Sequence, residues 1–158
     1  MIDKFLTYFE PSIGNIGCIA PVIAFTIAAS ISDRRMLKIP DRLNIVFFLF
    51  RALVAFFYPM TWEHIAGFTF GFLIICIPAM IILLPMGGDA KFSAVLGFWI
   101  GFGGMVFSMI VGVTLFVAVA FIKKMGRKDK MALGPYISVG TWTLIALYYG
   151  LAVIRWLS

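Results

Sequence analysis

Residues 92–122 read FSAVLGFWIGFGGMVFSMIVGVTLFVAVAFI, an unbroken run of 31 residues without a charge. Such a run indicates a helix in lipid, because about 20 apolar residues span a hydrocarbon core of roughly 30 Å. One straight helix over the whole run would extend about 46 Å, which is too long for a single crossing. Gly101, Gly103 and Gly104 lie near its middle, and glycine tolerates the backbone angles at which a helix ends. We therefore expect two helices, at residues 89–101 and 104–122.

The chain as a whole is also strongly apolar. Of its 158 residues, 63% are hydrophobic and 13% are charged, whereas soluble domains are about 45–50% apolar and about 25% charged. Four more apolar runs, at residues 11–32, 43–62, 65–88 and 131–154, are each long enough to enter a bilayer, although Arg51 interrupts the second. This composition excludes a water-soluble globular domain and predicts an all-α integral membrane protein.

The basic residues indicate how many helices cross and in which direction. If residues 92–122 form two helices, 10 of the 13 Lys and Arg residues fall in loops on one side, which the positive-inside rule makes cytoplasmic. If they form one helix, the basic loop 123–130 lies outside, against this rule. We predict one membrane-embedded domain over residues 1–158, a bundle of six transmembrane helices with both termini outside and a short fourth helix. The expected spans are residues 13–32, 42–59, 64–84, 89–101, 104–122 and 134–155.

Several other classes of site lack the residues that they need. The net charge of +6 does not indicate nucleic-acid binding, because the basic residues lie between apolar runs rather than along one face. Cys18 and Cys76 both lie inside apolar runs, and the chain has no CxxC motif and a single histidine, His64. We therefore predict no disulfide framework, metal site or cofactor, and we interpret His64 as a loop residue.

Two acidic residues lie where an apolar run meets the predicted cytoplasmic face. Asp33 ends the first run, and Asp89 opens the short fourth helix directly after Gly87 and Gly88. A carboxylate near the apolar zone is costly and needs a partner or a water-filled cleft. Two carboxyl groups that meet can share one proton and act as an aspartic protease does, one activating water and the other stabilising the oxyanion. A plainer interpretation stays open, in which both acids only cap helices or loops.

The segments around these acids resemble a known family. DRRMLKIPDRLN at residues 33–44 resembles the first catalytic motif of the type IV prepilin peptidases, and GGDAK at residues 87–91 resembles their second, the GxGD motif. LGPYI at residues 133–137 is similar to the Phe-Gly-Pro segment before the family's last helix. The resemblance implies a multi-pass aspartic endopeptidase of the bacterial inner membrane that cuts the leader from prepilins or pilin-like proteins at the cytoplasmic face. Asp33 and Asp89 would be its catalytic pair.

The resemblance also implies roles for residues beside the acids. Gly87 and Gly88 would permit close approach of the backbone, Lys91 would lie near Asp89 and favour its ionised form, and Pro40 would fix the start of the second helix.

The chain departs from the family's pattern in two ways. Met86 stands where GxGD has its first glycine, and Leu133 replaces the usual Phe of the third segment. Nothing corresponds to the cytosolic cysteine-bearing domain of the longer, methylating members. The chain therefore resembles the short, peptidase-only type, with no separate soluble or methyltransferase domain.

Two other functions stay open at this point. The same aspartates could serve a proton- or ion-coupled transporter, although such a protein needs polar groups that continue to the far side. The chain could also be a non-catalytic scaffold of a pilus or secretion assembly. Arg51 fits none of these directly, and we expect it to snorkel or to face a cavity.

Overall fold

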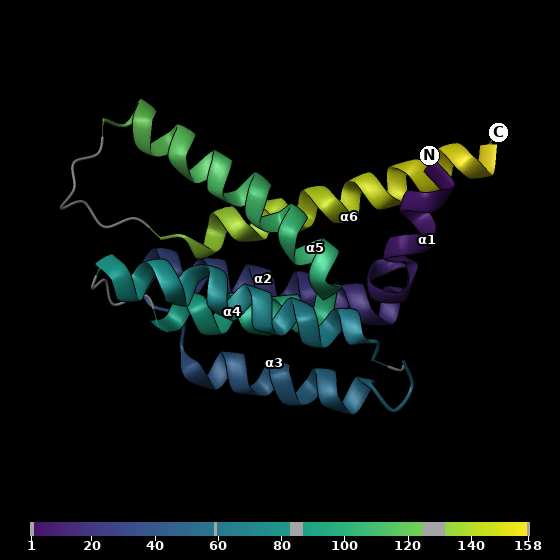
Figure 1. Cartoon of the computed structure of the whole chain (residues 1–158), viewed down its shortest axis with the longest axis horizontal. Coiled ribbons are helices and arrows are strands. Elements are labelled where there is room, and N and C mark those ends of the chain that lie inside the picture. The colour runs from purple at the N-terminus through teal and green to yellow at the C-terminus, as the bar shows by residue number, and fades with distance from the viewer. Residues whose placement is uncertain (1, 59, 83–86, 125–131, 158) are drawn as a thin grey trace.

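The computed structural model describes residues 2–58, 60–82, 87–124 and 132–157 (Figure 1). These residues form six helices, and the described part of the chain contains no strand. The helices are α1 (Ile2–Ile13), α2 (Ile16–Met36), α3 (Asp41–Val54), α4 (Trp62–Ile82), α5 (Gly87–Ile122) and α6 (Gly134–Leu157). The predicted all-α class is confirmed.

The first helix was not predicted. α1 carries charged residues on one side, while Leu6, Phe9 and Ile13 on the other side are buried. It is therefore amphipathic, and a search for uncharged runs passes over such a helix. Asn15 separates it from α2, where its side-chain oxygen accepts a hydrogen bond from the N–H of Gly17 at 3.2 Å. The predicted span 13–32 is corrected to Ile16–Met36.

α5 bends sharply at the glycine that the sequence singles out. Gly101 has φ 74° and ψ 175°, a conformation outside the helical region that glycine adopts without steric cost. Beyond this residue, the second half of α5 runs back toward the side from which the first half came (Figure 1). The expected division of the long apolar run into two helical segments is confirmed.

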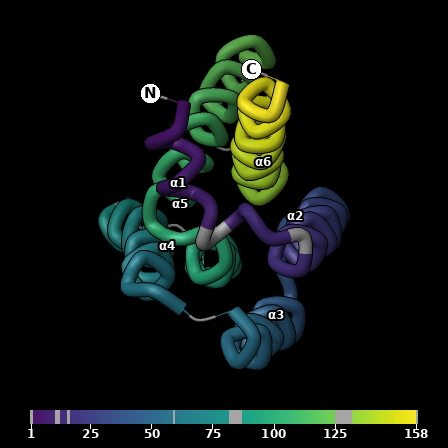
Figure 2. Tube along the Cα trace, turned by 90° about the vertical axis from the view of Figure 1, so that its right-hand side faces the viewer, coloured from purple at the N-terminus to yellow at the C-terminus, as the bar shows by residue number. Residues whose placement is uncertain are grey.

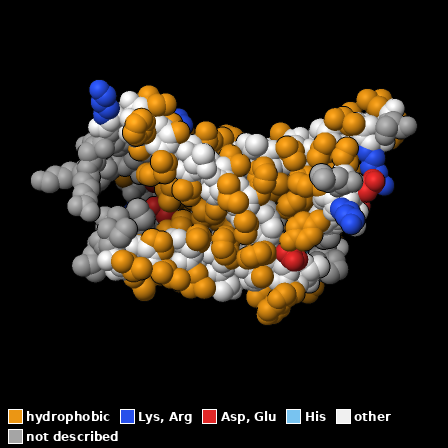
Figure 3. Space-filling view, turned by 45° about the horizontal axis from the view of Figure 1, so that its top comes forward, with side chains coloured by type: hydrophobic (Ala, Val, Ile, Leu, Met, Phe, Trp, Pro, Cys, Tyr) orange, Lys and Arg blue, Asp and Glu red, His pale blue; other side chains and the backbone are white. Residues whose placement is uncertain are grey.

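Among the residues that the structure describes, four helices are long and apolar enough to cross a membrane: Gly17–Met36, Trp62–Ile81, Gly87–Ile122 and Gly134–Leu157. α3 has 14 residues and ends at Val54, short of the predicted residue 59, because residues 55–58 bond back in turns. Hydrophobic side chains cover the middle of the molecular face in Figure 3, and charged side chains lie toward its two ends. The fold is that of a helical membrane protein, whereas the count of six crossings stays a prediction.

The first half of α5 is the centre of the bundle. Seen nearly end-on, it lies among α2, α3 and α4, with α6 and the second half of α5 above it (Figure 2). Every residue from Phe92 to Gly101 is buried. The first half of α5, which carries Asp89 in its first turn, is thus surrounded by protein.

Small residues allow α4 to pack directly on this central helix. A methyl group on Gly67 would collide with the carbonyl of Gly97, and one on Gly71 would collide with that of Ser93. Gly67 and Gly71, like Gly97 and Gly101, have the GxxxG spacing that is typical of closely packed helices in lipid, and only glycine lets the two backbones approach this far.

The two ends of the chain lie together. Asp3 of α1 forms a 3.1 Å ion pair with Arg155 of α6, and the Tyr149 hydroxyl donates to the carbonyl of Ile13 at 3.3 Å. Figure 1 shows the N and C labels side by side at one end of the molecule. Termini on one side agree with an even number of crossings, although that they lie outside stays a prediction.

Candidate active site

Asp33 lies in the last turn of α2, and its side chain is 3% exposed. Its Oδ2 accepts a hydrogen bond from the backbone N–H of Gly134, at 2.9 Å. Gly134 is the first residue of α6, where backbone N–H groups have no partner within the helix and carry partial positive charge. The carboxyl group of Asp33 therefore joins the end of α2 to the start of α6.

Asp89 lies in the first turn of α5 and is half-buried. Asp33 and Asp89 thus come from different helices, one at the end of α2 and the other at the start of α5. In the described residues, neither acid forms an ion pair with a basic side chain.

Ile39, in the segment between α2 and α3, lies between the two acidic helix ends. It is 1% exposed. A Cβ on Gly88 would lie 3.4 Å from the backbone N and O of Ile39, and one on Gly134 would lie 3.2 Å from its Cδ1. The starts of α5 and α6 thus both pack against Ile39, which brings Asp89 and Asp33 to the same end of the bundle.

The other residues expected to support the site are placed as follows. Gly87 is exposed, and a Cβ there would meet no atom within 4 Å, whereas Gly88 lies close to the backbone of Ile39. Pro40 precedes α3, and its carbonyl accepts from the N–H of Leu43 at 3.1 Å, so α3 begins directly after it. Met86 lies outside the described residues.

Lys91 pairs with a different acid from the one expected. Its Nζ lies 2.9 Å from Oδ2 of Asp41, the first residue of α3. Residues two apart on a helix do not face one another, which is why the Lys91 ammonium is not directed at Asp89. The hydrogen bond and charge of Lys91 hold the pKa of Asp41 below its usual value.

A ladder of buried hydroxyl groups runs along α2 and α6 behind Asp33. Ser138 Oγ donates to the carbonyl of Gly134 at 2.9 Å, and Ser30 Oγ donates to Ser138 Oγ at 2.9 Å. Farther along, Trp142 Nε1 donates to Thr26 Oγ1 at 2.8 Å. These residues were not singled out from the sequence, although their helical spacing from Asp33 and Gly134 is a signal that could have found them.

Two polar residues far from the acids are also buried. Arg51 is 1% exposed, with its guanidinium carbon 5.6 Å from the centroid of the Trp99 ring. His64 is fully buried, and its Nδ1 accepts from the N–H of Thr61 at 3.2 Å. The interpretation of His64 as a loop residue is wrong, because α4 begins at Trp62 and turns the ring into the bundle. Arg51 lies under an indole ring and does not snorkel.

Comparison with known proteins identifies the family. A model of the type IV leader peptidase family matches residues 20–122, a range that includes Asp33 and Asp89. A prepilin leader peptidase/N-methyltransferase of Bacillus subtilis (strain 168) is 27% identical over 139 residues, which are 84% of this chain and 55% of that protein. The chain therefore spans about half the length of this relative. No solved structure matches it at a significant level. Because the family model covers more than half of the sequence, the chain belongs to the type IV leader peptidase family.

Proposed function

We propose that this chain is an aspartic endopeptidase that cleaves the leader peptide from prepilins or pilin-like proteins, with Asp33 and Asp89 as its catalytic pair. The observation that carries the proposal is the placement of two acids from distant segments at one end of the bundle. Asp33 is buried and Asp89 is half-buried, and Ile39 packs against the starts of both α5 and α6. Two carboxyl groups that approach closely can hold one proton between them, which is the arrangement that hydrolysis without a covalent intermediate requires.

The hydrogen bond to Asp33 supports a division of roles. A backbone N–H that donates to a carboxylate favours its ionised form, and Asp33 has such a donor in Gly134. Asp33 then takes a proton from a water molecule as the water oxygen attacks the scissile carbonyl carbon. Asp89, in its protonated form, donates a hydrogen bond to the developing oxyanion. When the carbon–nitrogen bond breaks, the departing amine takes up a proton from the pair.

The charges around the site support its assignment to the cytoplasmic face. Exposed basic residues surround this end of the bundle: Arg34, Arg35, Lys38, Arg42 and Lys91. The positive-inside rule places such an end in the cytoplasm. We therefore propose cleavage at the cytoplasmic surface of the bacterial inner membrane, with six crossings and both termini outside.

Co-expression with a candidate prepilin tests the proposal. Asp33→Asn and Asp89→Asn are each expected to abolish the mobility shift of the prepilin on a gel, while both variants still insert into the membrane. Asp3→Asn, at the opposite end of the molecule, is the matched control and should leave cleavage intact. Cleavage retained in either site variant would reject the assignment of the pair.

One observation favours the alternative of a proton- or ion-coupled transporter: Arg51 and His64 are buried near the opposite end of the bundle. The central helix between the two ends argues against it. Phe92, Leu96 and Ile100 follow Asp89 on one face of α5, and all three are buried and apolar. Ion transport by the purified protein in liposomes, lost in the Asn variants, would support the transporter instead.

A further inference from the structure

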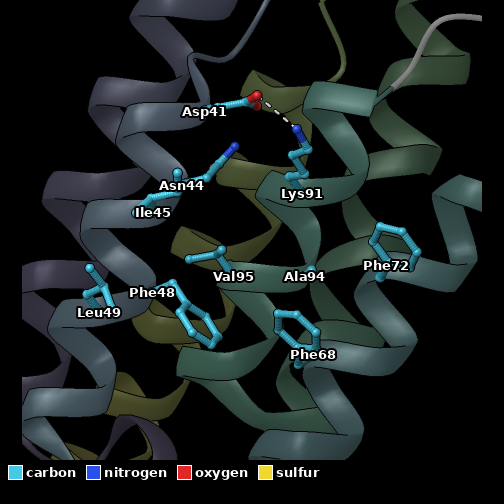
Figure 4. Close-up of a pocket in the computed structure, with 10 residues that line it drawn as sticks. All are labelled: Asp41, Asn44, Ile45, Phe48, Leu49, Phe68, Phe72, Lys91, Ala94 and Val95. Carbon is cyan, nitrogen blue, oxygen red and sulfur yellow. Dashed lines mark ion pairs between the residues drawn. The ribbon is translucent and has the colours of Figure 1, made fainter.

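A groove of about 390 Å³ lies between α3 and α4, beside the first half of α5 (Figure 4). Ile45 and Phe48 of α3 form one wall, Phe68 and Phe72 of α4 form the other, and Val95 of α5 lies between them. We call this the α3 groove. Nothing in the proposed hydrolysis uses it.

The α3 groove changes character along its length. Its mouth is polar, because Asp41 and Lys91 form their 2.9 Å ion pair there. Deeper in, the lining is apolar and ends in an aromatic cluster, with the ring of Phe48 5.1 Å from that of Phe98 and 5.8 Å from that of Phe68. A ligand that fills it must be polar at one end and apolar along the rest.

Asn44 lies one helical turn below the mouth and is 3% exposed. Neither its Oδ1 nor its Nδ2 has a hydrogen-bond partner in the described residues. Figure 4 shows the side chain directed across the groove from α3 toward α5. Burying an unpaired amide is unfavourable, and a ligand group that accepts and donates hydrogen bonds at this depth would satisfy it.

The mouth carries a net positive charge. Lys38 and Arg42 are exposed beside Asp41, and the charge of Lys38 acts on the Asp41 carboxylate. Residues 38–42 and Lys91 together thus carry three cations and one carboxylate. A ligand with a negative group at its polar end complements this surface.

The α3 groove is long enough for part of an extended chain. It follows α3 from Asp41 to Leu49, which is about 12 Å, or two turns. An acyl chain can lie along this apolar lining with its polar end at the mouth.

We propose that the α3 groove binds one anionic phospholipid of the surrounding leaflet. An acyl chain lies along the phenylalanine-lined wall, the amide of Asn44 bonds to the ester region, and Lys38, Arg42 and Lys91 face the phosphate. The bound lipid links the start of α3 to the start of α5, close to Asp89 in the chain. This inference does not depend on the proposed peptidase activity.

Thermal unfolding of the purified chain in an uncharged detergent tests the proposal. Added phosphatidylglycerol should raise the unfolding temperature by about 2–4 °C more than an equal amount of phosphatidylcholine. Asn44→Leu keeps the side-chain volume and should lose this lipid-specific difference. Ala94→Leu, which narrows the groove from α5, should lose it too. Lys123→Gln, an exposed basic residue outside the groove, should retain it.

Four results would overturn the proposal. Equal stabilisation by the two lipids, or a phosphatidylglycerol effect that survives both groove variants, would show that the groove holds no specific lipid. Stabilisation of the same size by inorganic phosphate alone would assign the effect to the basic mouth. Stabilisation by an apolar helical peptide in phosphatidylcholine, abolished by Asn44→Leu, would assign the groove to a peptide.

Discussion

The backbone N–H of Gly134 donates a 2.9 Å hydrogen bond to Oδ2 of Asp33, across 101 positions of sequence. This bond joins the last turn of α2 to the first residue of α6. It gives a buried carboxylate a donor that carries the partial positive charge of a helix start. The same contact requires glycine, because a Cβ at position 134 would lie 2.9 Å from Oδ2 and 3.2 Å from Ile39 Cδ1.

Gly134→Ala should therefore damage catalysis more than stability. The added methyl group pushes the Asp33 carboxylate away from its donor, and a shift of about 1 Å in a catalytic group can lower the rate about 100-fold. We expect a loss of prepilin cleavage of at least about 10-fold, with the unfolding temperature lowered by only a few degrees. Initial rates of cleavage and thermal unfolding of the same preparation check this.

Gly150→Ala is the matched control, since it makes the same change in α6 where a Cβ would meet no atom within 4 Å. It should leave cleavage unchanged and stabilise the chain slightly, because alanine favours a helix by about 1 kcal/mol over glycine. Full activity of Gly134→Ala would contradict the role given to the Asp33–Gly134 bond.

The hydroxyl ladder behind this bond is expected to show coupling between its members. Ser138→Ala removes the donor to the Gly134 carbonyl and leaves Ser30 Oγ without its acceptor, in a place where both side chains are at most 9% exposed. Each single alanine variant should cost about 0.5–1.5 kcal/mol of unfolding free energy. The double variant should cost less than the sum, because the second substitution removes the group that the first left unpaired. Additive losses in denaturant unfolding would mean that the two hydroxyl groups act independently.

Sequence patterns predicted those parts of the molecule that depend on one segment at a time. The break at Gly101 follows from a local run of glycines, and the helical class follows from composition. The positions of Asp33 and Asp89 at helix ends follow from where charge interrupts an apolar run. None of these inferences depends on the rotation of a helix about its own axis.

The contacts that went unpredicted all depend on that rotation. Lys91 faces Asp41, His64 turns into the bundle, and Ser30 meets Ser138, each through the orientation of one helix against another. When an uncharged run has little amphipathic pattern, its sequence does not indicate which side of the helix faces a neighbouring helix. α1 was not predicted although it has a clear amphipathic pattern, because its charged residues exclude it from a search for uncharged runs.

Arg51 and Trp99 offer a test of buried charge. Among the described residues, the guanidinium Nε of Arg51 has no partner, and its Nη1 makes one long bond of 3.5 Å to the Tyr58 carbonyl. Replacing a buried charge by an apolar side chain of similar size is often neutral or stabilising by about 1–4 kcal/mol. We therefore expect Arg51→Met to unfold at the same or a higher temperature, with cleavage retained.

Trp99→Leu should behave in the opposite way. The indole covers Arg51 at 5.6 Å, and its Nε1 donates to the carbonyl of Phe47 at 3.2 Å. Removing it opens a cavity and exposes a buried cation, at a cost of about 3 kcal/mol or more. The loss should shrink when Arg51→Met is already present, and an equal loss in both backgrounds would show that the ring does not stabilise the guanidinium.

The contact between α4 and α5 sets the last prediction. Because a methyl group on Gly97 would meet the backbone of Gly67, which has no rotamer to change, the two helices must separate to admit it. Gly97→Ala should lower the unfolding free energy by about 1–3 kcal/mol, in spite of the better helix propensity of alanine. Since the separation would tilt the first half of α5, which carries Asp89, cleavage should fall as well. Adding Gly67→Ala should not restore either quantity, because both changes push the same backbones apart. A stabilised Gly97→Ala variant, measured by thermal unfolding beside Gly150→Ala, would show that the helices pack less closely than their glycines indicate.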